Sequence, residues 1–406
     1  MEISQNLIEF VQKHENDDVN SLRLKYSSDK KIQTLDFPIE FALLQIEARR
    51  KTRKKLPSFV AKSDFIFPTL LSSEQASNEA VAKFHASLFP SGSSLLDLTA
   101  GLGIDDMEFA LHGCDVISCE IENVKCEALI HNSEVMGVRD RITVMNTDSI
   151  DYVSTTEDVF DVVFADPARR DLSGGRTHAL ADCQPDILGS LSRIMTISPR
   201  FLIKCSPLLD LSLIRDSIDI LSHIYVVCFK GECKEVLIDI IKDKGFSGVT
   251  VVDLDWTGEI SRFHTEFSPA DLSYSLPMLN VEKASSFRYL YEPNAGVMKT
   301  GAWSVLTTDF PDLVKADQNS HVFLSDSFYP DFPGRIVEIL SQPDKKALKA
   351  LKGARYNVVS RNHPLSAPKI ISKYGIIPGG DEFVYAFRYR STPIFLLGRL
   401  KATDQE

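Results

Sequence analysis

The spacing of apolar and polar residues divides the chain near residue 94. Before that point the pattern is helical. The stretch "PIEFALLQIEARRKTRKKL" starts a helix at Pro38 and repeats apolar residues at helical spacing, and residues 1–72 as a whole predict a helical region. The stretch "SSEQASNEAVAKFHASLF", residues 72–89, predicts one further helix, for which Ser72 or Ser73 would be the N-cap.

From residue 94 onward, short apolar runs alternate with amphipathic stretches. Strands are predicted in "SLLDLT", "CDVISCE", "RITVMNTD", "FDVVFADP", "RFLIKCSP" and "IYVVCFK", with helices between them. This alternation is typical of an α/β fold, in which helices cover both faces of a parallel sheet. The run "KEVLIDII" lies within hairpin reach of the last strand, so we expect an antiparallel hairpin to close one edge.

The last part of the chain has a different order of elements. Residues 247–284 are weakly patterned and predict a connecting segment. The runs "GRIVEIL", "RYNVVSR", "FVYAFRY" and "PIFLLGRL", with helices at 344–353 and after Pro364, predict a small α+β unit of order β-α-β-α-β-β. The expected division is 1–72 helical, 73–246 α/β, 247–284 connecting, 285–330 a small ferredoxin-like segment and 331–406 the α+β domain.

Composition limits the class of protein without naming it. The 406 residues suggest two or three domains, and 44% apolar and 25% charged residues are ordinary for a globular protein. The first residues lack the pattern of a signal peptide, and the apolar runs are too short to span a membrane. None of the seven cysteines forms a C-x-x-C motif, and no histidine pairs with one at metal-ligand spacing. We therefore expect reduced thiols, a cytoplasmic location, no membrane partner and no metal site.

The net charge of −11 argues against a protein whose whole surface binds nucleic acid, but two segments are basic. One is "RRKTRKK", residues 49–55. The other spans residues 345–373, contains no acid, and includes Lys345, Lys346, Lys349 and Lys352. A basic run is usually a solvated helix face. Two of them in an acidic chain favour a polyanionic partner such as RNA.

The stretch "LLDLTAGLGIDD", residues 95–106, ends a predicted strand with an acid and a Gly-x-Gly turn. Gly101 and Gly103 let the backbone approach a ligand, and Asp105 can cap the next helix. A dinucleotide site would need a third glycine where Asp106 stands, and carboxylates there would repel a pyrophosphate. S-adenosylmethionine has no phosphate and has a cationic amino acid end, which Asp97 could attract.

Acids also end the following strands. Glu120 can accept from both ribose hydroxyls, Asp148 can accept from an adenine amino group, and Asp166 would face the reacting group. A single acid at a strand end is more often a cap or turn residue. Because the carboxyl ends of parallel strands meet at one edge of a sheet, four such acids beside a Gly-x-Gly turn favour a ligand site.

Residues 94–240 resemble the class I S-adenosylmethionine-dependent methyltransferases, whose sheet is Rossmann-like. "DLTAGLG" is similar to motif I of members that act on RNA, and "DPAR", residues 166–169, matches the position of motif IV. The helix before motif I resembles one whose polar residues, here Gln75 and Ser77, reach the methionine end. The resemblance implies a cofactor-binding set of Gln75, Asp97, Thr99, Gly101, Gly103, Glu120, Asp148 and Asp166.

The whole chain, including "YLYEPNAGVMKTGAW" and "VVSRNHPLSAPKIISKYG", resembles bacterial methyltransferases that end in a THUMP-like domain. THUMP domains in other enzymes hold RNA. The resemblance therefore implies methylation of an RNA base, in tRNA or rRNA, with RNA held by the basic segments. The alternatives are methylation of a protein or small molecule, with the C-terminal domain used for association, and a silent binding module.

Motif IV of amino-methyltransferases reads Asp/Asn-Pro-Pro-aromatic. Asp166 and Pro167 fit this pattern, whereas Ala168 and Arg169 depart from it, so Arg169 would have to stack on the base. The predicted catalytic set is Asp166, Pro167 and Arg169.

Other candidates in the sequence have ordinary explanations. A C5-pyrimidine mechanism would need a nucleophile such as Cys205, which is more simply a buried thiol. Residues 169–178 predict a mobile loop over the substrate, with an ordinary surface loop as the alternative. His112 and His178 are expected to be structural.

Overall fold

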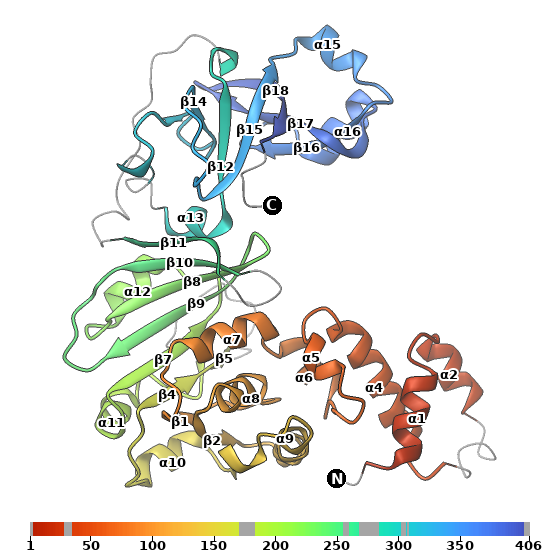
Figure 1. The fold of residues 1–406 in the computed structure, drawn as a ribbon, viewed down its shortest axis with the longest axis vertical. Helices are drawn as coiled ribbons and strands as arrows, with labels where there is room; N and C mark the ends of the chain where they lie inside the picture. The colour runs from red at the N-terminus through yellow and green to blue at the C-terminus, as the bar shows by residue number, and fades with distance from the viewer. Residues whose placement is uncertain are drawn as a thin grey trace. The chain divides into compact units, whose positions relative to one another are not determined.

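The computed structural model describes residues 3–27, 35–169, 183–254, 260–267, 284–301, 306 and 308–401. The chain forms two compact units (Figure 1). The first contains the residues up to Phe229 together with Lys234–Phe246 and Leu254–Glu259. The second contains Ile260–Glu406 with two short stretches, Lys230–Cys233 and Ser247–Asp253.

The N-terminal region is helical, as predicted. Side chains of Ser4, Asp18 and Thr69 accept hydrogen bonds from the first turns of three of its helices, which defines where these helices begin. Apolar residues of the first helices pack into a small core around Phe10, Leu43 and Ile46. The helices are α1 (Gln5–Lys13), α2 (Val19–Lys25), α4 (Ile39–Thr52), α5 (Pro57–Val60) and α6 (Leu70–Gln75).

The single helix expected over 72–89 is wrong. Helix α6 ends at Gln75, and α7 (Glu79–Ser87) begins after Asn78, whose side chain accepts from the backbone N–H of Ala80. The serines at 72 and 73 lie inside α6, where they are buried. This break matters because it leaves Ser77 in an irregular segment rather than on a helix face.

A mostly parallel sheet forms the centre of the first unit (Figure 1). Strand β1 pairs in parallel with β2 on one side and with β4 on the other, so the strand order reverses at β1. Ligands in such sheets bind at this reversal, beyond the carboxyl ends of the strands. The neighbouring strands are, in order, β8 (His223–Phe229), β9 (Glu232–Ile241), β7 (Arg200–Cys205), β4 (Val162–Ala165), β1 (Ser94–Asp97), β2 (Asp115–Glu120) and β3 (Ile142–Asn146).

Helices connect the parallel strands where the sequence pattern predicts them. Several of these helices begin later or end earlier than the pattern predicts. They are α8 (Ile104–Leu111), α9 (Asn123–Val135), α10 (Ser149–Thr155), α11 (Leu191–Ile197) and α12 (Leu211–Ser217). A short 3-10 turn, Arg139–Arg141, precedes β3, and two-residue strands β5 (Ala168–Arg169) and β6 (Cys183–Gln184) pair beyond β4.

The sequence predicts a hairpin at the edge of the sheet, and the position of β9 shows that this prediction is wrong. This strand lies between β7 and β8 and runs antiparallel to β7, from Arg200 opposite Ile241 to Cys205 opposite Val236. Its residues from 235 to 240 are all buried. An interior strand is apolar on both faces, which explains why "EVLIDII" does not alternate.

The second unit contains a seven-stranded sheet of order β13-β14-β12-β15-β18-β17-β16. Strand β12 lies on one side of the predicted boundary at 330 and pairs with β15 on the other, so the two segments share one sheet. The expected connection over 247–284 instead holds β10 (Val249–Leu254) and β11 (Ile260–Phe267). The other elements are β12 (Tyr289–Pro293), α13 (Ala295–Thr300), β13 (Val314–Lys315), β14 (Phe323–Ser325), β15 (Gly334–Ser341), α15 (Lys345–Ala350), β16 (Arg355–Arg361), α16 (Ala367–Tyr374), β17 (Ile377–Tyr389) and β18 (Thr392–Leu400), with a 3-10 turn at Ala284–Ser286.

The predicted order β-α-β-α-β-β is confirmed from β15 to β18. Ile370 of α16 and Leu351, which ends α15, pack with Val384 and Ala386 of β17. The alternate residues of β17, including Tyr385, pack into a different core. Both helices therefore cover the same face of the sheet.

Candidate cofactor and acceptor site

A cavity of about 780 Å³ opens at the carboxyl ends of β1, β2 and β4. It lies where the strand order reverses, so its position follows from the topology of the sheet. The structure brings all of the predicted cofactor-binding residues to its wall. They are Gln75, Asp97, Thr99, Gly101, Gly103, Glu120, Asp148 and Asp166, and Ser77 joins them.

The two glycines of the turn serve different purposes. Both have positive φ, 58° at Gly101 and 77° at Gly103. A Cβ atom on Gly103 would come within 2.1 Å of the Leu129 side chain, so this glycine lets α8 pack against α9. A Cβ on Gly101 would meet no atom closer than 3.8 Å, so that position is constrained by its conformation alone.

Glu120 is fixed at the end of β2 by two backbone donors. The N–H of Gly101 donates to its Oε2 at 3.1 Å, and the N–H of Glu122 donates to its Oε1 at 2.8 Å. The side chain of the next residue, Ile121, is 68% exposed and lines the cavity. An exposed aliphatic side chain beside a fixed carboxylate suits an aromatic ring next to a ribose. Sequence reasoning missed Ile121, although an apolar residue directly after a strand-end acid was visible.

Asp148 has two roles available to it. Its Oδ1 accepts from the backbone N–H of Ile150 at 2.8 Å and caps α10, which is the ordinary explanation for an acid at this place. Its other oxygen has no hydrogen-bond partner in the described part of the chain. Because Asp148 also lines the cavity, that oxygen is available to a ligand.

Asp97 and Asp166 are linked through Thr99. The N–H of Asp166 donates to Thr99 Oγ1 at 2.6 Å, and Thr99 Oγ1 donates to Asp97 Oδ1 at 3.3 Å. Asp97 is only 2% exposed, and burial together with the charge of Asp106 raises its pKa well above the ordinary value. Asp97 therefore organises the turn, and a cationic ligand would favour its ionised form.

Asp106 is placed differently from what the sequence suggests. It is fully buried and does not line the cavity, so it cannot repel a pyrophosphate from there. Neither of its carboxyl oxygens has a hydrogen-bond partner among the described residues. Burial raises its pKa to about 7, so much of it is protonated at neutral pH. Asp105, by contrast, does not cap α8 with its side chain.

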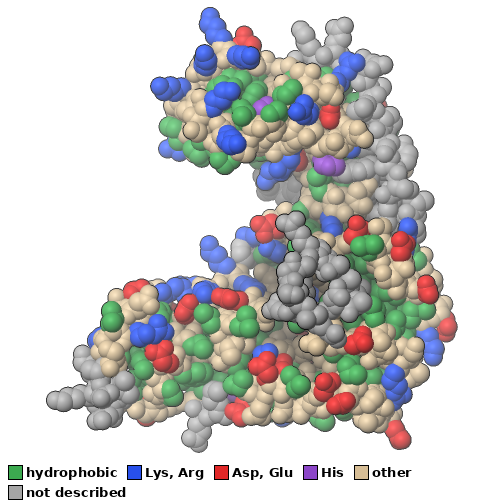
Figure 2. All heavy atoms as spheres, turned by 180° about the vertical axis from the view of Figure 1, so that it is seen from behind, with side chains coloured by type: hydrophobic (Ala, Val, Ile, Leu, Met, Phe, Trp, Pro, Cys, Tyr) green, Lys and Arg blue, Asp and Glu red, His purple; other side chains and the backbone are tan. Residues whose placement is uncertain are grey.

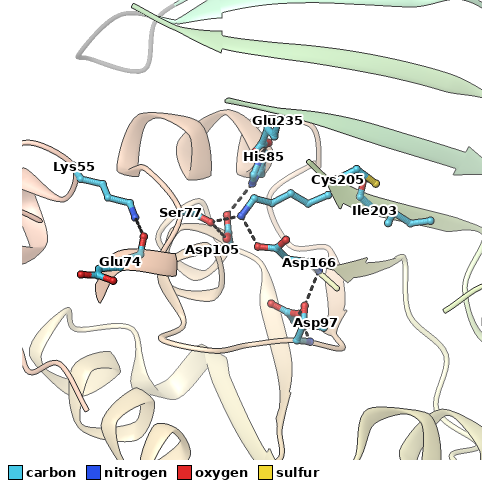
Figure 3. A network of polar contacts seen from close by, with 12 residues as sticks. Lys55, Glu74, Ser77, His85, Asp97, Asp105, Asp166, Ile203, Cys205 and Glu235 are labelled. Atoms are coloured by element: carbon cyan, nitrogen blue, oxygen red, sulfur yellow. Dashed lines mark hydrogen bonds and ion pairs between the residues drawn. The ribbon is translucent and has the colours of Figure 1, made fainter. Parts of the chain in front are cut away.

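The acceptor end of the cavity holds an ion pair between Asp166 and Lys204 (Figure 3). Lys204 Nζ donates to Asp166 Oδ2 at 2.5 Å and to Ser77 Oγ at 2.9 Å. Lys204 lies on β7 and its side chain is 12% exposed, whereas that of Asp166 is 40% exposed. Sequence reasoning missed Lys204, although it is the one charged residue within the apolar run "FLIKC".

A buried histidine completes this part of the site. His85 of α7 contacts Asp105 Oδ1 through Nδ1 at 2.8 Å and Glu235 Oε1 through Nε2 (Figure 3). Burial would lower the pKa of His85, but the charges of Glu235 and Asp105 outweigh it and raise the pKa to about 9. The same contact with His85 outweighs the effect of burial on Asp105 and lowers its pKa to about 2. His85 is therefore an imidazolium that donates to both carboxylates at neutral pH.

The remaining candidate residues from the sequence lie in different environments. Pro167 follows Asp166 but is not part of the cavity wall. Arg169 pairs with Cys183 through the backbone, and its side chain, like His178 and the rest of the predicted loop to residue 178, lies outside the described residues. Cys205 is buried, which raises the pKa of its thiol and disfavours a nucleophilic role. His112 contacts the carbonyl of Phe89 at 3.0 Å.

The described residues contain neither a metal-binding cluster nor a membrane-spanning helix. No group of three or more His, Cys, Asp or Glu side chains could hold a metal ion there. No helix in the same residues is long and apolar enough to span a membrane.

The basic run at 49–55 mostly serves the N-terminal helices, which corrects the expectation that it is a free basic surface. The guanidinium of Arg49 reaches the carbonyls of Val60, Lys62, Ser63 and Phe65 within 3.0 Å. Arg50 donates to two more carbonyls, Lys51 pairs with Glu47 and Glu74, and Lys55 donates to the Glu74 carbonyl at 2.8 Å. Burial and the charge of Lys204 lower the pKa of Lys55 to about 8.

Comparison with known families locates two matches. Residues 92–178 match the family described as RNA cap guanine-N2 methyltransferase, and residues 289–333 match a ferredoxin-like domain. The first match covers the Gly-x-Gly turn and three strands that wall the cavity. The second covers β12 to β14 and ends just before β15.

Individual relatives agree with these matches. One stretch is 35% identical over 81 residues to ribosomal RNA small subunit methyltransferase J of Francisella tularensis subsp. novicida, covering 18% of this chain and 34% of that protein. The chain thus matches about a third of that relative's length. A crystal structure from Porphyromonas gingivalis W83, provisionally assigned as a methyltransferase, superposes with a TM-score of 0.82 at 23% identity and covers 99% of this chain and 100% of that one.

The likeness to the Porphyromonas structure establishes a shared fold over nearly the whole chain. The predicted Rossmann-like sheet and the separate ferredoxin-like unit are confirmed. The family match over the motif-bearing strands supports the prediction of a methyltransferase enzyme that uses S-adenosylmethionine.

Proposed function

We propose that this chain transfers a methyl group from S-adenosylmethionine to a base in RNA, in tRNA or rRNA. The observation that carries the proposal is the cavity at the strand reversal, whose wall holds the Gly-x-Gly turn and the four strand-end acids together. The matches to an RNA cap guanine-N2 methyltransferase family and to a ribosomal RNA methyltransferase support RNA as the acceptor.

The residues of the cavity fit each part of the cofactor. Glu120 would accept from the ribose hydroxyls, Ile121 would pack on the adenine, and the free oxygen of Asp148 would accept from its amino group. Gln75 and Asp97 would hold the cationic amino acid end, with Thr99, Gly101 and Gly103 shaping the turn around it. When bound, the cofactor supplies the reactive methyl group and its own leaving group.

At the acceptor end, the protein aligns the nucleophile and accepts a hydrogen bond from it. Asp166 would take this role, since its carboxylate is partly exposed in the cavity and its backbone is held by Thr99. Pro167 would keep the segment extended. Arg169 would stack on the base in place of the aromatic residue found in related motifs.

The C-terminal unit would hold the RNA in the manner of a THUMP-like domain. Lys345, Lys346, Lys349 and Lys352 are exposed on and just after α15, and Lys369 and Lys373 are exposed on α16. Figure 2 shows Lys and Arg side chains gathered on the lobe formed by this unit. Phosphate contacts of this kind position a polyanion without reading its sequence.

We also propose a cytoplasmic location. All seven cysteines are free thiols, and five of them are buried. Thiols persist in reducing compartments, so this state fits the cytoplasm. Fractionation of cells that express a tagged chain would test it.

The test of the main proposal is methyl transfer from labelled cofactor to total RNA and to total protein, both prepared from cells that lack this chain. We expect label in RNA only. Label in protein alone would favour the alternative, a protein methyltransferase whose C-terminal unit serves association. An Asp166→Ala variant is the matched control, because it retains the backbone N–H that holds Thr99.

A further inference from the structure

A row of hydrogen-bonded polar side chains, most of them charged, adjoins the acceptor end of the cavity (Figure 3). It starts at Glu235 on β9, passes through His85 on α7 and Asp105 on α8, and reaches Ser77 between α6 and α7. Ser77 Oγ accepts from Lys204 on β7, and Lys204 pairs with Asp166. The row thus joins four elements of the first unit to a single carboxylate in the cavity.

The charges in this row alternate from negative to positive at each ionisable member. Glu235, His85 and Asp105 are 4%, 0% and 9% exposed, so their charges are removed from water. Burying ions costs free energy that apolar residues of the same volume would not, and such replacements are often neutral or stabilising. The row therefore has no clear advantage as a packing device.

Its geometry suggests a different advantage. Asp166 is the ionisable member most exposed to the cavity, and Lys204 occupies its Oδ2. The other oxygen, Oδ1, has no partner within the described residues. With one oxygen held, the carboxylate can present only the other to an acceptor.

We propose that Lys204 is a positioning residue that keeps Asp166 ionised and aimed at the acceptor, and that Glu235, His85 and Asp105 hold Lys204 in place through Ser77. This inference rests on the proposed function, since it concerns the carboxylate that faces the acceptor. It adds Lys204, His85 and Glu235 to the residues that the sequence motifs single out.

The electrostatics of the site give this proposal a measurable signature. Burial, opposed by the charge and hydrogen bond of Lys204 and assisted by the charges of Asp105 and Glu235, leaves the pKa of Asp166 above its ordinary value. Without the Lys204 ammonium, the remaining influences all favour the protonated carboxyl. The pKa of Asp166 must then rise, and the acid limb of activity must move to higher pH with it.

The experiment uses the full chain with Lys204→Gln, and Lys204→Arg as the variant that keeps the charge. Carbon-13 NMR follows the titration of the Asp166 carboxyl, with Asp166→Asn used to assign the signal. We expect Lys204→Gln to titrate at least one pH unit higher than the parent and Lys204→Arg to lie between the two. In single turnover, Lys204→Gln should lose about 100-fold in rate while the Kd of the cofactor changes less than 3-fold.

A matched control is Lys83→Gln, which removes a lysine–carboxylate pair with Glu79 on the same helix as His85 but outside the row. It should leave both the titration and the rate unchanged. If Lys204→Gln does not fold, Ser77→Ala removes the link between Asp105 and Lys204 without changing any charge. We expect a slower single turnover and an acid limb displaced upward by a smaller amount.

The outcomes separate this inference from the proposed function. An Asp166 carboxyl that titrates at the same pH in the parent and in Lys204→Gln overturns the positioning role, whether or not RNA is methylated. A parent that methylates no RNA but shows the expected shift overturns the proposed substrate and leaves the positioning role standing.

Discussion

Two short basic stretches of this chain look alike in sequence and lie in opposite environments. In the run at 49–55, Arg49, Arg50 and Lys55 donate hydrogen bonds to backbone carbonyls of neighbouring segments. In the stretch from 345 to 373, the lysines are exposed on one helical layer of the C-terminal unit. The first stretch holds the N-terminal helices together, and the second is free to meet a polyanion.

This difference teaches that basic composition alone does not identify a binding surface. A basic segment is available for binding only where no unpaired carbonyl or acidic side chain lies within hydrogen-bonding distance of its side chains. Helix α4 is followed by a short helix and an irregular segment, which offer carbonyls that no helix satisfies. Helices α15 and α16 pack against β17, whose backbone pairs with β16 on one side and with β18 on the other.

The charged residues of the cavity extend the comparison, and the largest effect is expected there. Asp166→Ala should lower the single-turnover rate at least about 1,000-fold, because it removes the group that accepts from the acceptor. Cofactor affinity should stay within about 3-fold, since the backbone N–H of residue 166 still donates to Thr99. Asp166→Asn retains an acceptor oxygen and should lose less rate. Equal losses of rate and cofactor affinity would show that Asp166 belongs to the cofactor end.

The exposed lysines should show the next largest effect. Reversing Lys345, Lys346, Lys349 and Lys352 to Glu should weaken RNA binding about 100-fold at low salt, and the slope of log affinity against log salt should become shallower by about three. Cofactor binding should not change. Filter binding across a salt series measures both quantities. Undiminished RNA binding by this variant would favour a solvated helix face beside a protein-interaction surface.

Removing the buried charge of the first stretch should affect stability and leave binding intact. Arg49→Met leaves several carbonyls of residues 60–65 without a donor, which costs about 3 kcal/mol. Because this opening is local, amide exchange in α5 and the following segment should speed up about 100-fold while the second unit is unchanged. Mass spectrometry after deuterium exchange resolves the two regions. Arg49→Lys is the control, since it keeps the charge but can reach fewer carbonyls.

The acid at the end of β2 should give a smaller and strictly local effect. Glu120→Ala removes charge-assisted hydrogen bonds worth about 1.5–3 kcal/mol each, so the affinity for S-adenosylmethionine should fall at least tenfold. It also frees the N–H of Gly101 from its acceptor. Titration calorimetry measures the loss, and Glu134→Ala serves as the control because Glu134 is exposed on α9 and does not line the cavity. Binding of NAD with no response to the methyl donor would contradict the cofactor assignment.

The sequence predicts the cavity well because its parts are local. Asp97 ends one strand and the two glycines follow it, whereas Glu120 ends the next strand and Asp148 comes two residues after the third. Parallel strands bring those ends to one edge whatever the details of packing. The Rossmann-like sheet and the ferredoxin-like unit could be predicted for the same reason, since each depends on the order of short apolar runs.

The positioning row could not be predicted in this way. His85 and Glu235 are 150 residues apart, and Ser77 and Lys204 are 127 apart, so no local pattern connects them. Their meeting depends on two features that differ from expectation, the break between α6 and α7 and the interior position of β9. A histidine in an apolar helix is ordinarily a core residue, and only its two carboxylate partners distinguish His85.

The smallest expected effect tests the comparison most directly. Arg53 and Lys54 are exposed, and neither has a partner within the described part of the chain. They are therefore the charges of the run at 49–55 that are available to a ligand. Reversing both to Glu should weaken RNA binding by no more than about 3-fold, because two isolated charges contribute few phosphate contacts. The stability of the N-terminal helices should not change. A loss comparable to that of the four-lysine variant would instead mean that the RNA surface extends over the N-terminal helices, and the contrast between the two basic stretches would fail.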